Sequence, residues 1–152
     1  MNKGKLLGID HGIKRIGIAV CDGLRLSVRE LTVIRRRSRH EDFARINAIA
    51  QEEGVVGIVV GLPVNFDAPP DQQTQADTVR LWVDRLLDTT ELPVILWNEQ
   101  FSSEDAKALA RQKRRKPTDP IDDLAARVIL QSYIDSLHDG LVNDNVPPAA
   151  HD

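Results

Sequence analysis

The 152-residue sequence contains a single cysteine, Cys21. One thiol excludes a framework of internal disulfide bonds and any zinc site built from several cysteines. It also fits a reducing compartment, so we expect a cytoplasmic protein. Apolar runs of about 18 residues are missing, and the charged Asp10 comes too early for the apolar core of a signal peptide. We therefore expect neither a membrane span nor secretion.

Aromatic residues are scarce, at 4% of the chain, and the formal net charge is only −3. Few aromatic side chains argue against a surface that stacks on many unpaired bases. The weak negative charge argues against a protein that coats nucleic acid generally. The cations are nevertheless concentrated at Arg35–Arg39 and at Arg111–Lys116. Such clusters suit local contact with a polyanion, although charge runs are more often solvated loops or helix ends.

The length and the 41% content of hydrophobic residues predict one globular domain with an ordinary core. We assign residues 1–138 to this domain and expect the polar residues 139–152 to form a disordered tail. Hydrophobic periodicity predicts the order β-β-β-α-β-α-β-α-α. The expected strands cover residues 5–9, 16–20, 27–34, 55–60 and 93–97, and the expected helices cover residues 40–53, 73–87, 102–112 and 119–137.

This order of elements predicts an α/β fold. Three strands in an antiparallel meander, followed by two strands that are parallel to the first, give a five-stranded mixed sheet with helices on both faces. The first strand is expected at its centre. Gly54 is expected to end the first helix. The last helix is expected to begin with Asp119 as its N-cap and Pro120 at its first helical position.

Three carboxylates stand at the ends of expected core elements. Asp10 ends the first strand, Glu99 follows the last strand, and Asp122 lies in the first turn of the last helix. If the two strands run parallel, their carboxyl ends meet at the edge of the sheet where sites form. Like charges brought together require a cation, and hard oxygen ligands fit Mg²⁺ or Mn²⁺. Each acid alone has an ordinary explanation, such as the helix dipole for Asp122, and only the three together indicate a metal site.

The pattern of the last helix indicates which of its first two acids faces the sheet. Asp122 heads a row of uncharged side chains, whereas Asp123 lies four residues before Arg127 and can pair with it. We therefore expect Asp122 to point inward. A pair of metal ions about 3.5–4 Å apart stabilises the attacking and leaving oxygens of a phosphodiester, which is the chemistry such a site suits.

The segment after Asp10 is a turn with glycine on both sides, which allows the backbone to approach a ligand closely. Lys14 and Arg15 are placed there to meet phosphate oxygens, although an ordinary hairpin turn with exposed cations explains them too. We expect His11 to be a turn residue rather than a ligand or a base. Cys21 is expected to be a buried strand residue rather than a nucleophile.

Several blocks of the sequence resemble one known family. They are LGIDHGIKRIGIAV at residues 7–20, IVVGLPVN at 58–65, NEQFSS at 98–103, ID at 121–122 and VILQSY at 128–133. Together they resemble the YqgF/RuvX family, whose members are described as pre-16S rRNA nucleases and as Holliday junction resolvases. The resemblance spans about residues 6–137. It implies a ribonuclease H-like fold, divalent metal held by Asp10, Glu99 and Asp122, and a site bordered by residues 61–63 and Asn65.

The sequence departs from the family pattern near two of the acids. The family usually has Asp-Glu-Arg where this chain has Asn98-Glu99-Gln100, so the glutamate is kept and a neighbouring cation is lost. A Gly-Lys pair often precedes the last aspartate, where this chain has Asp119 and Pro120. Asp119 is then either the N-cap or an auxiliary fourth ligand. These departures leave the three acids intact and bear on how the phosphate is positioned.

The leading hypothesis is a metal-dependent nuclease that processes the 5′ end of precursor 16S rRNA. The residues expected to contact nucleic acid are Lys14, Arg15, Asn65, Arg114 and Arg115. They are expected to bind its phosphate backbone, and such contacts carry no sequence information. One alternative is resolution of four-way DNA junctions, in which paired cuts require a symmetric homodimer. Another is a non-catalytic RNA-binding module, supported only by the absence of a cation at Gln100.

Overall fold

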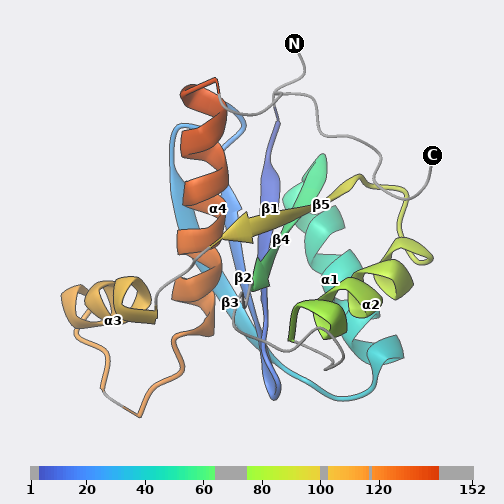
Figure 1. The fold of residues 1–152 in the computed structure, drawn as a ribbon, viewed down its shortest axis with the longest axis horizontal. Coiled ribbons are helices and arrows are strands. Elements are labelled where there is room, and N and C mark those ends of the chain that lie inside the picture. The colour runs from blue at the N-terminus through green and yellow to red at the C-terminus, as the bar shows by residue number, and fades with distance from the viewer. Residues whose placement is uncertain (1–3, 64–74, 100–102, 117, 141–152) are drawn as a thin grey trace.

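The computed structural model describes residues 4–63, 75–99, 103–116 and 118–140, with the backbone alone at residues 99 and 103–105. The strands are β1 (Leu6–His11), β2 (Arg15–Cys21), β3 (Val28–Arg35), β4 (Gly57–Pro63) and β5 (Val94–Glu99), and the helices are α1 (Arg39–Glu53), α2 (Gln75–Leu87), α3 (Ser103–Gln112) and α4 (Asp122–His138) (Figure 1). Residue 102, where the third helix is expected to begin, and most of the predicted tail lie outside the described residues.

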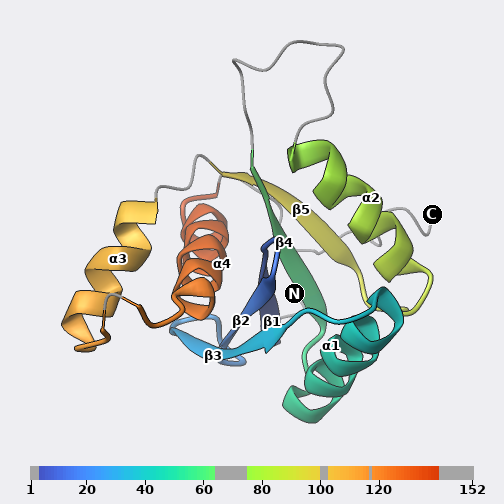
Figure 2. The ribbon, with the colours of Figure 1, turned by 90° about the horizontal axis from the view of Figure 1, so that it is seen from below.

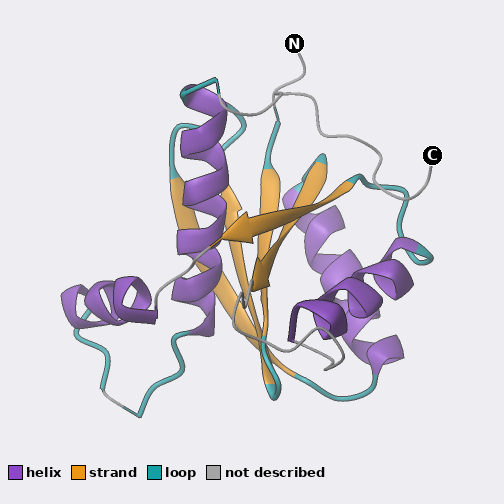
Figure 3. Ribbon diagram, viewed as in Figure 1, coloured by secondary structure: helices purple, strands orange, loops and turns teal. Residues whose placement is uncertain are grey.

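The strands form one five-stranded sheet in the order β3-β2-β1-β4-β5, drawn in orange in Figure 3. β1, β2 and β3 make an antiparallel meander, whereas β4 runs parallel to β1 and β5 runs parallel to β4. The mixed sheet and its central first strand confirm the predicted α/β architecture. Because β1, β4 and β5 are parallel, their carboxyl ends reach the same edge of the sheet.

Helices cover both faces of the sheet, as Figure 2 shows. α1 and α2 pack on one face and form the larger apolar cluster with the sheet. α4 packs on the other face, and α3 packs against the outer side of α4. Side chains alternate between the two faces along each strand, so that Leu7 and Ile9 of β1 join the first cluster and Leu6 joins the second.

The contact between α4 and the sheet depends on glycine. A Cβ atom at Gly17 of β2 would overlap the main-chain carbonyl of Asp122, and one at Gly8 of β1 would lie 2.7 Å from the Cβ atom of Leu130. Only residues without a side chain allow backbone and helix to approach this closely. The first turn of α4 therefore lies directly on β2, beside the end of β1.

The start of α4 differs from the prediction. The helix begins at Asp122 with Ile121 as its N-cap, and no side chain caps it. Asp119 is not the cap, because its Oδ2 atom accepts the backbone N–H of Lys116 at 2.7 Å. The acid and Pro120 therefore belong to the turn that precedes the helix. Asp122 is nonetheless in the first helical turn, as predicted.

His11 also differs from the prediction, because it is the last residue of β1 rather than part of the turn. The alternation of the strand places its ring among the buried side chains on the α1 and α2 face, 4.7 Å from the ring centroid of Trp82. Burial lowers the pKa of His11 to about 4. Cys21 is a buried strand residue, as predicted, and its Sγ atom accepts the N–H of Leu6.

The other predictions for the helices agree with the structure. Gly54, with φ of 69°, ends α1, and its N–H donates to the last carbonyls of the helix. At the other end, Ser38 Oγ accepts the N–H of Glu41 at 3.1 Å and caps the helix. Apolar side chains of both α1 and α2 are buried on the sheet.

Candidate active site

The site begins with Asp10, which lies next to the carboxyl end of β1 and pairs in register with Gly17 of β2. The first turn of α4 lies on Gly17, so Asp122 arrives beside Asp10 from a distant part of the chain. Burial, and after it the negative charge of Asp122, raises the pKa of Asp10 to about 6. The structure therefore brings together two of the three predicted carboxylates.

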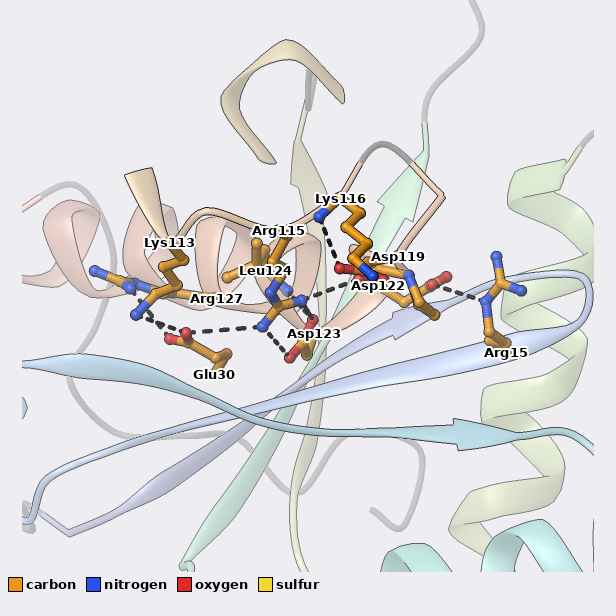
Figure 4. A network of polar contacts seen from close by, with 11 residues as sticks. Arg15, Glu30, Lys113, Arg115, Lys116, Asp119, Asp122, Asp123, Leu124 and Arg127 are labelled. Atoms are coloured by element: carbon orange, nitrogen blue, oxygen red, sulfur yellow. Dashed lines mark hydrogen bonds and ion pairs between the residues drawn. The ribbon is translucent and has the colours of Figure 1, made fainter. Parts of the chain in front are cut away.

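Arg15 forms an ion pair with one of these two acids, Asp122. Its Nε–H donates to Asp122 Oδ2 at 3.0 Å, as Figure 4 shows. The turn that carries Arg15 is closed by the Gly12 N–H, which donates to the Arg15 carbonyl at 2.9 Å. A Cβ atom at Gly12 would lie 3.4 Å from Asp122 Oδ1. The β1–β2 turn and the first turn of α4 thus form one wall of the site.

Glu99 is the last residue of β5, and its backbone pairs in register with Pro63 of β4. This position is at the same edge of the sheet as Asp10, because β1, β4 and β5 are parallel. The Glu99 side chain is outside the described part of the structure. Among the residues that are described, no three His, Cys, Asp or Glu side chains form a group able to hold a metal ion. The role of Glu99 stays a prediction.

A basic groove borders the acid pair. Arg15 and Lys14 line it from the β1–β2 turn, and Arg35–Arg37 line it from the end of β3, with Ile13 and Pro120 completing the walls. Arg36 holds the turn in place, since its guanidinium donates to the Gly12 carbonyl at 3.0 Å. Within the described residues, Lys14 and Arg35 form no ion pair. The sequence indicated this cluster without showing that its cations meet the turn of Lys14.

The second basic cluster is divided between two roles. Arg115 binds both carboxylate oxygens of Asp123, at 2.7 and 2.9 Å, and this carboxylate raises the pKa of its guanidinium (Figure 4). Arg114, its exposed neighbour, has a φ of 58° and forms no ion pair with the described residues. Arg115 therefore fastens the α3–α4 loop to α4, whereas Arg114 presents its charge to solvent.

Asp123 does not pair with Arg127, although their spacing in the helix allows it. Arg127 instead binds Glu30 of β3 at 3.1 Å, and Lys113 binds the same carboxylate at 2.9 Å. The reason is that this side of α4 faces β3, which offers Arg127 a nearer acid, while Arg115 occupies Asp123. Sequence spacing within α4 contained no signal for Glu30, which lies 97 residues away.

Asp119, Asn65 and residues 61–63 are the remaining predicted parts of the site. Residues 61–63, which were expected to form a loop after the strand, are instead the last three residues of β4. Asp119 holds the turn before α4 through Lys116 and forms the wall of a small pocket beside α3. It lies three positions before Asp122 in the chain and makes no capping contact. Asn65 is outside the described residues, as is Gln100. Their predicted places beside the site therefore remain predictions.

The fold is shared with known resolvases. RuvC of T. thermophilus, in complex with a Holliday junction substrate, superposes with a TM-score of 0.59 at 17% identity, covering 90% of this chain and 96% of that one. The fowlpox virus resolvase in complex with Holliday junction DNA gives a TM-score of 0.54 at 14% identity, over 88% of this chain and 98% of that one. The chain therefore has the ribonuclease H-like fold of the RuvC-type resolvases.

The sequence places it more narrowly. A family model described as "RuvX: Holliday junction resolvase" matches residues 4–136, and the chain belongs to this family. A Cereibacter sphaeroides protein named "Putative pre-16S rRNA nuclease" is 41% identical over 137 residues, covering 88% of this chain and 84% of its own. A Symbiobacterium thermophilum protein of the same name is 41% identical over 135 residues, covering 85% and 90%.

No helix within the described ranges combines the length and the apolar character that crossing a bilayer requires.

Proposed function

We propose that the protein is a metal-dependent nuclease that processes the 5′ end of precursor 16S rRNA in the cytoplasm. Membership of a family of nucleases and resolvases supports hydrolysis of phosphodiester bonds, and the names of the relatives support the RNA substrate. The observation that carries the proposal is the meeting of Asp10 and Asp122 at the end of the central strand, beside a basic groove.

The donor set fits a divalent cation. Asp10 is partly buried next to a second carboxylate, so its ionised form needs a neighbouring positive charge. In the structure the Arg15 guanidinium provides part of this positive charge through its ion pair with Asp122. We propose that Asp10, Asp122 and Glu99 hold Mg²⁺ or Mn²⁺, which prefer hard oxygen ligands. The ion supplies activation of a water molecule and neutralisation of the charge that develops on the scissile phosphate.

Side chains of the protein bind and position the nucleic acid. Lys14 and Arg15 bind phosphate oxygens in the basic groove and so place the scissile bond beside the acids. Arg114, in the α3–α4 loop, contacts the phosphate backbone of the nucleic acid. Arg115 keeps that loop in place by binding Asp123. Asn65, which follows β4 in the sequence, is assigned to nucleic-acid binding by the family resemblance. Asp119 acts in this scheme through the turn before α4 rather than as a ligand.

Replacing either acid tests the proposal. Asp10→Asn and Asp122→Asn each keep the size of the side chain and remove a ligand charge, so we expect both to lower cleavage of a precursor 16S rRNA fragment by about 100-fold or more. Cleavage by the wild-type protein should stop in EDTA and return with Mg²⁺ or Mn²⁺. Asp84→Asn, at an exposed position of α2, is the matched control and should cleave normally.

Unchanged cleavage by Asp10→Asn would refute the assignment of Asp10. An inactive wild-type protein that still binds the RNA would favour the non-catalytic module instead.

A second candidate is resolution of four-way DNA junctions, which the description of the matching family favours. The chemistry at the acids is the same, but paired cuts in a junction need two sites related by symmetry, hence a homodimer. The same preparations should be tested on four-way junctions, with the molecular mass in solution measured in parallel. Paired junction cuts by a dimer, without cleavage of the RNA, would replace the leading proposal with this one.

A further inference from the structure

Arg15 stands between the acid pair and the basic groove. Its Nε–H donates to Asp122 Oδ2, and the same side chain lines the groove (Figure 4). Within the described residues no other cation forms an ion pair with Asp122. The Arg15 side chain is 46% exposed, compared with 18% for Asp122, so the guanidinium can leave the carboxylate without disturbing the core.

The two expected partners of Asp122 oppose one another. Under the proposed function, Asp122 ligates a divalent cation, yet in the structure it binds a guanidinium. A dication and a guanidinium at one carboxylate repel each other, so each weakens the binding of the other. The same repulsion drives Arg15 away from the acids once a metal ion is bound, toward any negative charge within its reach.

The groove holds the place where such a negative charge would bind. Lys14 and Arg35 line it and form no ion pair with the described residues, so both can receive an anion. A guanidinium donates two parallel N–H bonds to phosphate oxygens, which makes Arg15 better suited to that contact than to a single bond with Asp122. Arg15 can therefore bind either Asp122 or a phosphate group in the basic groove.

We propose that Arg15 is a counter-ion that holds Asp122 while the metal is absent and turns to a phosphate of the nucleic acid when the metal binds. The inference rests on the proposed function, because it takes Asp122 as a metal ligand. Since the exchange releases Arg15 for the nucleic acid, metal and nucleic acid increase each other's affinity by the same factor. Arg15 is thus a positioning residue that couples the two binding events.

Mn²⁺ binding to the free protein tests the first half of this exchange. Titration calorimetry at about pH 7.5 and low salt compares wild type with Arg15→Gln and Lys14→Gln. Lys14→Gln removes the same charge from the same turn but no ion pair, so it corrects for the general electrostatic effect. We expect Arg15→Gln to bind Mn²⁺ up to about fivefold more tightly than Lys14→Gln, the factor expected for a partly exposed ion pair. Equal or weaker binding by Arg15→Gln overturns the proposal.

Asp122→Asn separates failure of this inference from failure of the metal site. If wild type binds Mn²⁺ and Asp122→Asn does not, while Arg15→Gln matches Lys14→Gln, the metal site stands and only the role of Arg15 fails. If Asp122→Asn binds Mn²⁺ as wild type does, Asp122 is not a ligand, and both fall. Circular dichroism and thermal melting confirm that each variant is folded.

Nucleic-acid affinity tests the second half. Fluorescence anisotropy with a labelled oligoribonucleotide is measured in EDTA and in Ca²⁺, which also takes oxygen ligands. Arg15→Gln should weaken binding more in Ca²⁺ than in EDTA, because in EDTA the guanidinium is already bound to Asp122. Lys14→Gln should weaken binding by a similar factor in both. A reduction for Arg15→Gln that is the same with and without Ca²⁺ overturns the proposed exchange.

Discussion

Asp10 carries its charge where the metal-free fold disfavours one. Burial and the nearby Asp122 raise its pKa from 3.8 to about 6, so the folded state binds a proton more tightly than the unfolded chain does. Between these two values the folded protein holds more protons than the unfolded one. Its stability must therefore fall as the pH rises through that window.

We expect this decrease in stability to be visible in the metal-free protein between about pH 4 and pH 6. Asp10→Asn removes the charge, so it should be more stable than wild type at about pH 7.5, by up to about 3 kcal/mol, and the difference should disappear below about pH 4. Urea denaturation in EDTA over this range gives the measurement. Equal stability of the two proteins at about pH 7.5 would contradict the electrostatic account of the site.

Arg114 and Arg115 show that neighbouring cations in one run can have different roles. Arg115 is bound to Asp123 by two hydrogen bonds and also donates to the Pro120 carbonyl at 3.0 Å. Asp123 is buried, so removal of the Arg115 side chain would leave a buried carboxylate without its main partner. The charge run predicts that cations gather here, but their partners depend on how α3 and α4 are packed.

The contact between α4 and β2 sets the position of Asp122. Gly17→Ala places a methyl group where the carbonyl of Asp122 lies, and the first turn of α4 must move to admit it. We expect this substitution to destabilise the fold by about 2 kcal/mol or more and to displace Asp122 from Asp10. Chemical denaturation gives the stability, and the Mn²⁺ titration gives the effect on the site.

Gly23→Ala is the matched control for this change, since a Cβ atom at Gly23 meets no atom of the described residues within 4 Å. It should leave both stability and Mn²⁺ binding close to wild type. If Gly17→Ala proved as stable as Gly23→Ala, the close approach would not be the feature that positions α4.

The elements were predictable from sequence because their signals are local. The strands stand out as apolar runs, and Gly54 marks the end of α1. The start of α4 was predicted incorrectly because the carboxylate of Asp119 has a competing partner, the N–H of Lys116, that a capping pattern does not reveal. The contact of Arg127 with Glu30 was missed because helical spacing describes only neighbours within one helix.

For the whole molecule, the distribution of charge matters more than its sum. The formal net charge is −3, yet five cations line one groove beside the acids. The sequence predicted both the acids and the two basic clusters. The predicted meander pairs β2 with β3, but the sequence could not predict that Arg36 donates to the Gly12 carbonyl and so joins Arg35–Arg37 to the turn of Lys14.

This arrangement predicts that the cations of the groove, together with Arg114, set the salt dependence of nucleic-acid binding. Removing one cation that binds a phosphate lowers the slope of log affinity against log salt concentration by about 0.7–0.9. We expect Arg114→Gln to reduce the slope by about this amount, and the double variant Lys14→Gln, Arg35→Gln to reduce it by up to about twice as much. Filter binding over a salt series gives the slopes.

The matched comparison for the groove is Arg39→Gln, an exposed cation of the same cluster that does not line it. Its slope should stay close to that of wild type. A double variant with the slope of Arg39→Gln would remove the groove from the binding surface.

The main chain of α4 contacts the main chain of β2 at Gly17, and this contact determines which amino-acid substitutions affect the site. Side chains elsewhere in the interior can be exchanged for others of similar volume without altering the thickness of this seam. Substitutions that accumulate in the apolar core should therefore leave the spacing of Asp10 and Asp122 unchanged. A designer could remodel the α1 and α2 layer extensively and still retain the geometry on which the proposed hydrolysis depends.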